Sequence, residues 1–241
     1  MLRRSMSVLL CFLILSLTAL PAVGAAAATN NAHVRFLHAA PGVRNIDIHV
    51  DGNALLKGFA FQSVSDYAPL SSGKHQIELF ATGEQKDPIF SEEFDLEAEV
   101  AVTAAVAGQG EDLHVELYPD QSGLRDNQAS LRLIHLSPNA PTVDLATLGG
   151  QGLFTGIDAL AASPYKELSP GELNLTINPS GNPEAPTVSE VALDLEPGKA
   201  YSAVLTGIAG AAPGLEVLLL EDGIVPGLPK TGLGGASPIV E

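Results

Sequence analysis

The chain has 241 residues and a formal net charge of −16, from 28 acidic and 12 basic side chains; 46% of its residues are hydrophobic and 17% are charged. An acidic surface of this kind repels nucleic acid and anionic lipid, so we expect no nucleic-acid partner. The apolar content is typical of a chain that folds and not of a disordered acidic segment, and the length suggests one or two domains.

The N-terminal segment has the layout of a secretory signal peptide. Arg3 and Arg4 precede a mostly apolar run at 8–20, and Pro21 and a series of small residues follow it. The apolar run is short for a membrane span, although an uncleaved anchor helix is the alternative. We therefore predict a signal peptide at 1–28, cleavage by signal peptidase between Gly24 and Thr29, and a mature chain without a transmembrane span that is secreted, extracellular or associated with the cell wall.

The single cysteine, Cys11, lies inside the apolar run of the predicted signal peptide. The mature chain then has no disulfide and no thiolate to act as a metal ligand or nucleophile. Cleavage also removes two basic residues and no acidic ones, so the net charge becomes −18. We expect an acidic extracellular protein that is stabilised by its core alone.

Comparison of the chain with itself shows an internal repeat, in which four segments recur in the same order. The pairs are 34–50 with 131–147, 63–79 with 161–177, 94–108 with 193–207, and 113–120 with 215–222. The offset grows along the chain, which places insertions around 51–57, 80–93 and 108–112, where turn-forming residues gather. A repeat of this length favours two tandem domains over a solenoid.

Between the turns, apolar and polar residues alternate with a period of two, as in Ile46-Asp47-Ile48-His49-Val50. This pattern predicts half-buried antiparallel strands, roughly seven in each repeat, and no long window has helical periodicity. The fold class we expect is all-β, with two tandem immunoglobulin-like antiparallel β-sandwich domains. Their boundaries are 31–123 and 129–224, with a linker at 121–128 and a flexible Pro/Gly-rich tail at 225–241.

The segments "VRFLHAAPGVRNIDIHVDG", "VSDYAPLSSGKHQIELF" and "FDLEAEVAVTAAVAG" resemble the bacterial domain of unknown function 4397 family. The resemblance covers almost all of 33–224, in two copies. It implies a secreted or wall-associated bacterial protein and carries no activity with it. The second copy departs from the pattern, because Leu148-Gly149-Gly150 replaces the Asp-Gly turn that follows the strand in the first.

Three polar residue types recur in both repeats and form the candidate site: Arg35/Arg132, His38/His135 and Asp47/Asp144. One interpretation is a binding site of histidine, arginine and aspartate. The other, which we favour because residues repeated in two domains belong most simply to the fold, is a structural clamp. In such a clamp the aspartate accepts from the arginine or from turn amides, and the histidine closes the loop beside its proline. The repeat-equivalent Tyr67 and Tyr165 are predicted to be core residues with hydrogen-bonded hydroxyls.

Other catalytic or metal-binding patterns find little support. Asp47, His49 and Asp51 alternate on one strand and could suit a metal, but the second repeat has Ala146 and Leu148 at the last two positions. There is no G-x-S-x-G elbow and no recognisable pair of catalytic acids. The mature chain also lacks tryptophan for stacking on sugars. We predict that the protein is not an enzyme and has no catalytic residue, metal or cofactor.

The tail contains Leu228-Pro229-Lys230-Thr231-Gly232, which resembles the L-P-x-T-G sorting signal of sortase substrates. In that class an apolar span and basic residues follow the motif, whereas only nine residues without either follow Gly232 here. We predict that a sortase-type cysteine enzyme cuts after Thr231 and joins it to an amine of the cell wall or of a protein. The alternative is a flexible tail that is never cut.

Two function classes remain. The first is a non-catalytic secreted or cell-surface module, such as a spacer, an adhesion component or an envelope-assembly component. The second is a soluble secreted protein that binds a glycan or a small ligand, with a tail that has no role.

Overall fold

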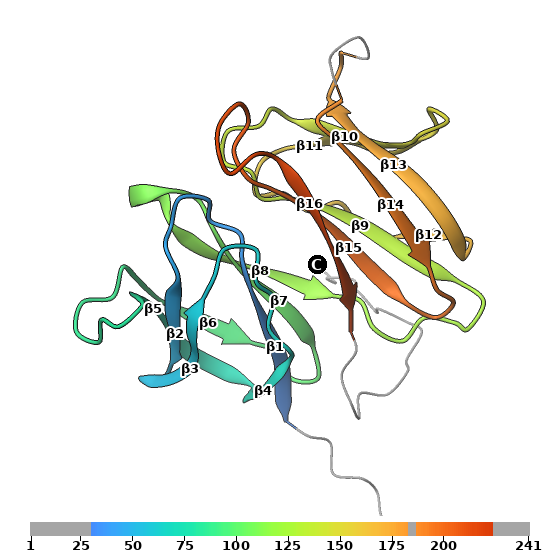
Figure 1. Ribbon diagram of the computed structural model, residues 1–241. Helices are drawn as coiled ribbons and strands as arrows, with labels where there is room; N and C mark the ends of the chain where they lie inside the picture. Colours follow the sequence, from blue (N-terminus) through green and yellow to red (C-terminus); the bar gives the residue numbers. More distant parts are fainter. Residues whose placement is uncertain (1–29, 183–186, 224–241) are drawn as a thin grey trace, which may run out of the picture.

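The structure is a computed structural model that describes residues 30–182 and 187–223 (Figure 1). The predicted signal peptide at 1–28 and the motif at 228–232 lie outside these residues. The described residues contain sixteen strands, one short 3-10 helix (η1, Gly110–Asp112) and no α-helix. Accordingly, no helix in this part of the chain is long and apolar enough to cross a membrane.

The first domain is a β-sandwich of two four-stranded sheets. One sheet has the order β4 (Ala68–Ser71), β1 (Asn31–His38), β7 (Ala101–Ala107), β8 (His114–Asp120). The other has the order β3 (Asn53–Phe59), β2 (Ile46–Val50), β5 (Gly73–Ala81), β6 (Phe90–Leu96). We call them the inner and the outer sheet, because only the first faces the second domain.

The second domain repeats this architecture strand by strand. Its inner sheet has the order β12 (Lys166–Leu168), β9 (Ala129–His135), β15 (Ala200–Thr206), β16 (Glu216–Asp222). Its outer sheet has the order β11 (Gly152–Ile157), β10 (Val143–Thr147), β13 (Gly171–Pro179), β14 (Ser189–Leu195). The predicted all-β fold with two β-sandwiches is therefore confirmed, and residues 121–128 lie between β8 and β9.

Three local features differ from the expectation. Each domain has eight strands instead of about seven, and the predicted insertion region at 51–57 is mostly strand β3. In each inner sheet the central pair is parallel, β1 with β7 and β9 with β15. Parallel neighbours cannot be joined by a tight hairpin, and here most of the domain separates the two strands in the sequence.

The hairpin after the second strand forms in both domains, although its turn differs. In the first domain Asp51 and Gly52 both have positive φ, 52° and 75°, as a two-residue type I′ turn requires. In the second domain Leu148-Gly149-Gly150-Gln151 makes a longer turn, in which the Thr147 amide donates to the Gln151 carbonyl at 2.8 Å. The one extra residue lies in the turn, so the strands on either side keep their pairing.

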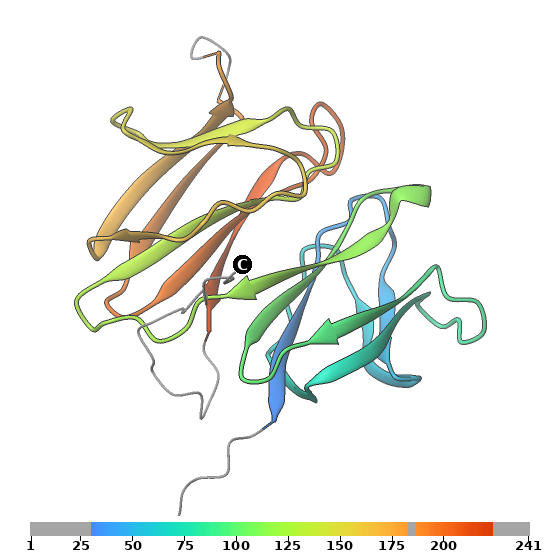
Figure 2. The ribbon, with the colours of Figure 1, turned by 180° about the vertical axis from the view of Figure 1, so that it is seen from behind.

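The central strands of the inner sheets are buried on both faces, and every residue of β7, β9 and β15 is buried. One face of each inner sheet packs on its own outer sheet, and the opposite faces pack on each other (Figures 1 and 2). The apolar contact between the domains includes Leu37, Ala105, Ile134, Leu136 and Val204. The molecule is thus four sheets deep, and strands buried on both faces, such as "AVTAAVA", have no polar alternation.

Candidate functional site

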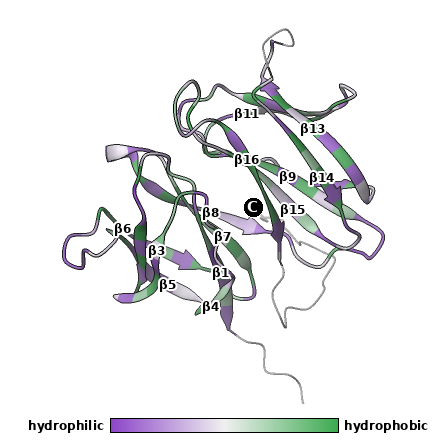
Figure 3. Ribbon diagram, in the orientation of Figure 1, coloured by the Kyte–Doolittle hydropathy of each residue, from purple (hydrophilic) through white to green (hydrophobic). Residues whose placement is uncertain are grey.

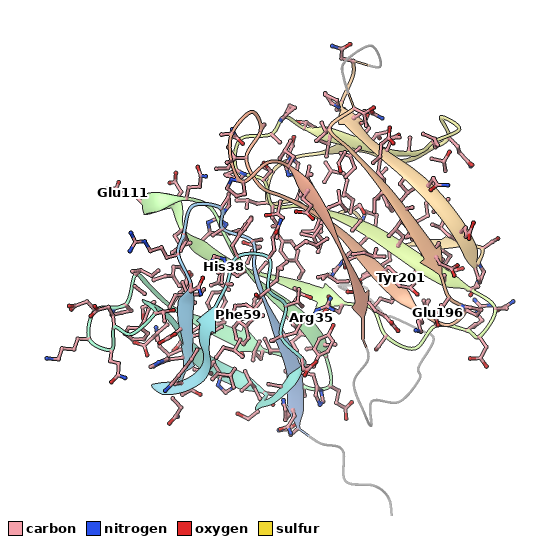
Figure 4. The ribbon with its side chains drawn as sticks, in the orientation of Figure 1. Arg35, His38, Phe59, Glu111, Glu196 and Tyr201 are labelled. Carbon is pink, nitrogen blue, oxygen red and sulfur yellow. The ribbon has the colours of Figure 1, made fainter. Side chains whose placement is uncertain are left out.

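Arg35 extends from the first domain to the last strand of the second domain. It lies on β1 and is 4% exposed, and its guanidinium forms an ion pair with Asp222 on β16. Its Nη1 donates to the Glu221 carbonyl at 2.7 Å, while its Nε donates to the Thr103 hydroxyl of its own domain at 2.8 Å. Figure 4 labels Arg35 on the strand that faces the second domain. This arginine therefore links the two inner sheets.

Arg132 makes the same contacts in the opposite direction. From β9 its guanidinium forms an ion pair with Asp120 on β8, and its Nη1 donates to the Pro119 carbonyl at 2.7 Å. Its Nε donates to the Ser202 hydroxyl at 2.6 Å. These three contacts of Arg35 thus have counterparts at the equivalent positions, so this cluster is isologous, with approximate two-fold symmetry. Arg35 additionally lies 3.6 Å from Asp120 of its own domain.

Tyr67 and Tyr165 complete the two halves of this interdomain cluster. The Tyr67 hydroxyl donates to Asp120 at 2.6 Å, and the guanidinium carbon of Arg35 lies 4.9 Å from the centre of the Tyr67 ring. The Tyr165 hydroxyl donates to Asp222 at 2.8 Å, with Arg132 lying 4.6 Å from its ring centre. Both tyrosines combine a hydrogen-bonded hydroxyl with a cation–π contact, which fixes the position of each arginine.

Backbone amides from the opposite domain also reach the tyrosines. The amide of Gly223 donates to the Tyr67 hydroxyl, and that of Gln121 donates to the Tyr165 hydroxyl, both at 3.2 Å. Each carboxylate in turn accepts from a hydroxyl of its own domain, Asp120 from Thr103 and Asp222 from Ser202. The symmetry of the cluster therefore extends to its backbone contacts.

The buried guanidinium groups and carboxylates of the cluster neutralise one another. Burial raises the pKa of the Asp120 carboxyl, and the nearby Arg35 and Arg132 oppose this shift. Burial lowers the pKa of Arg35, but Asp120 and Asp222 outweigh it and the net pKa is raised. Burial also raises the pKa of Tyr67 and Tyr165, so both hydroxyls stay protonated and donate. Two guanidinium groups thus face two carboxylates, and loss of one of them would leave an unpaired buried charge.

The arginine, histidine and aspartate of each repeat do not meet at one place. Arg35 and Arg132 lie in the interdomain cluster, whereas Asp47 lies on the outer sheet and accepts from the amides of Gly58 at 2.7 Å and Gly83 at 3.3 Å. The Gly58 hydrogen bond lowers the pKa of Asp47 against the opposing effect of burial. Asp144 accepts from the amide of Gly156 at 2.7 Å. Both carboxylates therefore bind backbone amides and not the arginine of their repeat.

The two histidines occupy a third place, at the ends of β1 and β9, where both are fully buried. The Nε2 atom of His38 lies 3.3 Å from the Arg44 carbonyl, and that of His135 lies 3.1 Å from the Pro141 carbonyl. Burial lowers the pKa of both, so the rings are neutral and donate to these carbonyls. The histidines close the loops that follow their strands, and His38 also stacks near Phe59 at 6.5 Å (Figure 4).

A further polar set, which the sequence patterns did not reveal, lies only in the first domain. His75 is 7% exposed, and its Nδ1 lies 2.7 Å from an Asp51 carboxylate oxygen. Its Nε2 lies 2.7 Å from the Ser71 carbonyl and 3.3 Å from the Ser71 hydroxyl. Because each ring nitrogen lies close to an acceptor, this geometry favours the protonated ring, which cannot take a proton from Ser71. The set therefore lacks the base that a Ser-His-Asp triad requires.

Within the described ranges, 30–182 and 187–223, no three histidine, aspartate or glutamate side chains are grouped so as to hold a metal ion. Asp47, His49 and Asp51, the candidate metal pattern, have other contacts. Asp47 binds the amides described above, Asp51 binds His75, and the His49 ring packs on Phe80 with 4.6 Å between centres.

The first domain is similar to a known protein family. Residues 32–146 match the model of the family named domain of unknown function (DUF4397). The match covers the strands of the first domain, the linker, β9 and most of β10, and it supports the resemblance for this segment. A search of curated proteins finds none that match the chain.

Among solved structures, the Bacillus anthracis TIE protein matches with 8% sequence identity and a TM-score of 0.24. The aligned part covers 73% of this chain and 34% of that protein, so this chain spans about a third of its length. A TM-score of this size carries no argument about the fold or function of this chain.

Proposed function

We propose that the protein is a non-catalytic secreted or cell-surface module, in which two copies of the family's domain act as one rigid body. The observation that supports this proposal is the isologous cluster, because Arg35 and Arg132 each anchor one domain on the last strand of the other. A body of this kind suits a spacer, an adhesion component or an envelope-assembly component. Its repeated arginines bind carboxylates of the opposite domain across the interface, which is a structural role.

We assign residues 129–224 as the second copy. Three observations support this assignment: the order of strands in both sheets, the parallel central pair of the inner sheet, and the equivalence of the cluster residues. The equivalent pairs are Arg35/Arg132, Tyr67/Tyr165, Thr103/Ser202 and Asp120/Asp222.

The route to the cell surface rests on the two terminal motifs. The signal peptide at 1–28 directs export and is removed by signal peptidase. The sortase cysteine then attacks the Thr231 carbonyl and forms a thioester with it, while the Thr231–Gly232 amide breaks. The peptide that begins at Gly232 leaves, with a free amine at its new N-terminus. An amine of the cell wall or of a partner protein attacks the resulting thioester, which forms a new amide and regenerates the thiol.

Intact-mass analysis of the protein made by its native host tests both steps. We expect an N-terminus between Ala25 and Thr29 and a C-terminus at Thr231 that carries a covalent adduct. A Thr231→Ala variant is the matched control, and it should keep the residues up to Glu241. Secretion is refuted if the protein begins at Met1, and sorting is refuted if every wild-type molecule still ends at Glu241.

A further inference from the structure

The outer sheet of the second domain carries an open groove of about 600 Å³ on the face turned away from its core. Its floor contains Asp144 and Ala146 of β10 and Thr176 and Asn178 of β13, and Glu190 of β14 lies at its side. These residues alternate with buried ones such as Leu145 and Ile177, so they point outward. Figure 3 shows this alternation of hydrophilic and hydrophobic residues along β13.

The first domain has larger side chains at the same positions. Asp47 is paired with Phe80 across β2 and β5, as Asp144 is paired with Asn178 across β10 and β13. His49 of the first domain corresponds to Ala146, and its ring packs on Phe80 at 4.6 Å. The replacement of histidine by alanine and of phenylalanine by asparagine opens the face of the second domain. The groove of the second domain therefore lies where its outer sheet has smaller side chains than the outer sheet of the first.

The polar groups of the groove can donate and accept hydrogen bonds. The Asn178 amide donates to the Thr176 hydroxyl at 3.2 Å, which orients both groups and leaves the amide oxygen and a second N–H for a ligand. Among the described residues, Asp144 is bound through Oδ1 to the Gly156 amide, so Oδ2 is available as an acceptor. Leu148, 63% exposed, lines the groove and offers an apolar contact.

We propose that this groove binds a segment of a neutral glycan, which lies along β13. Paired donors and acceptors match sugar hydroxyls, which are themselves both. Among the described residues no three acidic or histidine side chains are grouped there to hold a cation. The net charge of −16 disfavours anionic ligands. The volume lies within the range of about 300–1,000 Å³ that small-molecule sites occupy. This proposal goes beyond the display role and does not depend on it.

The groove has no tryptophan or tyrosine on which a sugar ring could stack. Hydrogen bonds between the groove and a ligand replace bonds that both make to water, so each contributes little net free energy. We therefore expect weak binding, with a Kd on the order of 1 mM, which is a free energy of about −4 kcal/mol.

The test is an amide NMR titration of the full mature chain with cellohexaose, xylohexaose and mannohexaose. At least one of these neutral probes should shift the amides of 144–148 and 174–178, while those of 47–51 and 76–80 in the first domain stay unchanged. The matched control is the double variant Ala146→His/Asn178→Phe, which installs the side chains of the first domain and should weaken binding at least about tenfold. Thr176→Val, which removes only the hydroxyl, serves if the double variant loses its native spectrum.

Three results would overturn the proposal: no shift with any neutral probe, unchanged affinity in the control variants, or binding of a glucosamine hexamer or hexagalacturonate alone. The intact-mass result for secretion and sorting would be unaffected by any of them. The two proposals can therefore fail separately.

Discussion

The two domains are alike in the cluster through which they meet and different where they face outward. The inner sheets contribute equivalent residues to the interface, Arg35/Arg132 and Asp120/Asp222, with equivalent partners on both sides. The outer sheets differ at His49/Ala146, Phe80/Asn178 and His75/Leu173. An isologous interface constrains both partners at once, because a change on one side removes a contact needed by the other. No such constraint acts on the outer sheets, so their side chains and turns can differ.

The largest effect is expected from breaking the interdomain cluster. Arg35→Met leaves the buried Asp222 carboxylate without an ion pair, and Arg132→Met leaves Asp120 only the more distant Arg35, at 3.6 Å. Loss of a buried ion-pair partner should lower the free energy of unfolding by about 3–5 kcal/mol. Arg35 lies near both carboxylates and Arg132 near one, so the loss should be at least as large for Arg35→Met as for Arg132→Met. Chemical denaturation followed by circular dichroism measures both.

The double variant Arg35→Met/Asp222→Leu is the control for this effect. It removes both charges of one half of the cluster, so it should recover part of the loss seen in Arg35→Met. If either single variant costs under about 1 kcal/mol, as for an exposed ion pair, the buried cluster does not stabilise the protein in the way described.

A smaller effect distinguishes the two outer-sheet aspartates. Asp47 is 7% exposed and accepts from two amides, whereas Asp144 is half-buried and accepts from one. Asp47→Ala should therefore lower stability on the order of 1–3 kcal/mol, and Asp144→Ala by less, because fewer buried donors lose their partner. Equal or reversed losses in thermal denaturation would contradict this ranking.

The smallest effect is a loss of stability at alkaline pH that arises from His75 of the first domain. Burial lowers the pKa of His75, but the hydrogen bonds to Asp51 and Ser71 outweigh it and the net pKa is raised. The stabilisation that His75 contributes is therefore complete below the pKa of a free histidine, about 6.5. It is lost as the pH rises through the higher pKa that His75 has in the folded protein. His38 and His135 have lowered pKa values, so their contribution is lost only on the acid side.

Melting temperatures of the wild type and of His75→Leu between pH 6 and pH 9 measure this effect. The variant introduces the residue of the second domain, Leu173, and should remove most of the loss of stability on the alkaline side. A wild-type melting temperature that stays level or rises over this range would refute the cationic state of His75.

The repeat in the sequence was enough to predict two β-sandwiches, because alternation and turn residues are local signals. It could not predict the partner of Arg35, which pairs with Asp222, 187 residues away and in the other domain. Spacing within a repeat describes one domain and not the surface on which it meets another. The sequence did contain one indication of the interdomain contact. The strand "AVTAAVA" has no polar alternation, which indicates burial on both faces.

The contact of His75 with Asp51 was missed for a different reason. Alternation treats Asp51 as a strand residue on the face of Asp47 and His49. Asp51 instead lies in the turn with a φ of 52°, and its side chain reaches His75. The direction of a turn side chain depends on backbone conformation, which period-two patterns do not describe.

Nitrogen-15 relaxation of the full mature chain tests the central claim most directly, namely that the two domains form one rigid body through the isologous cluster. We predict one overall correlation time for the amides of both domains, as expected for a body of their combined mass. Two shorter and separate correlation times, with low order parameters at 121–128, would show domains that move independently and would contradict the claim.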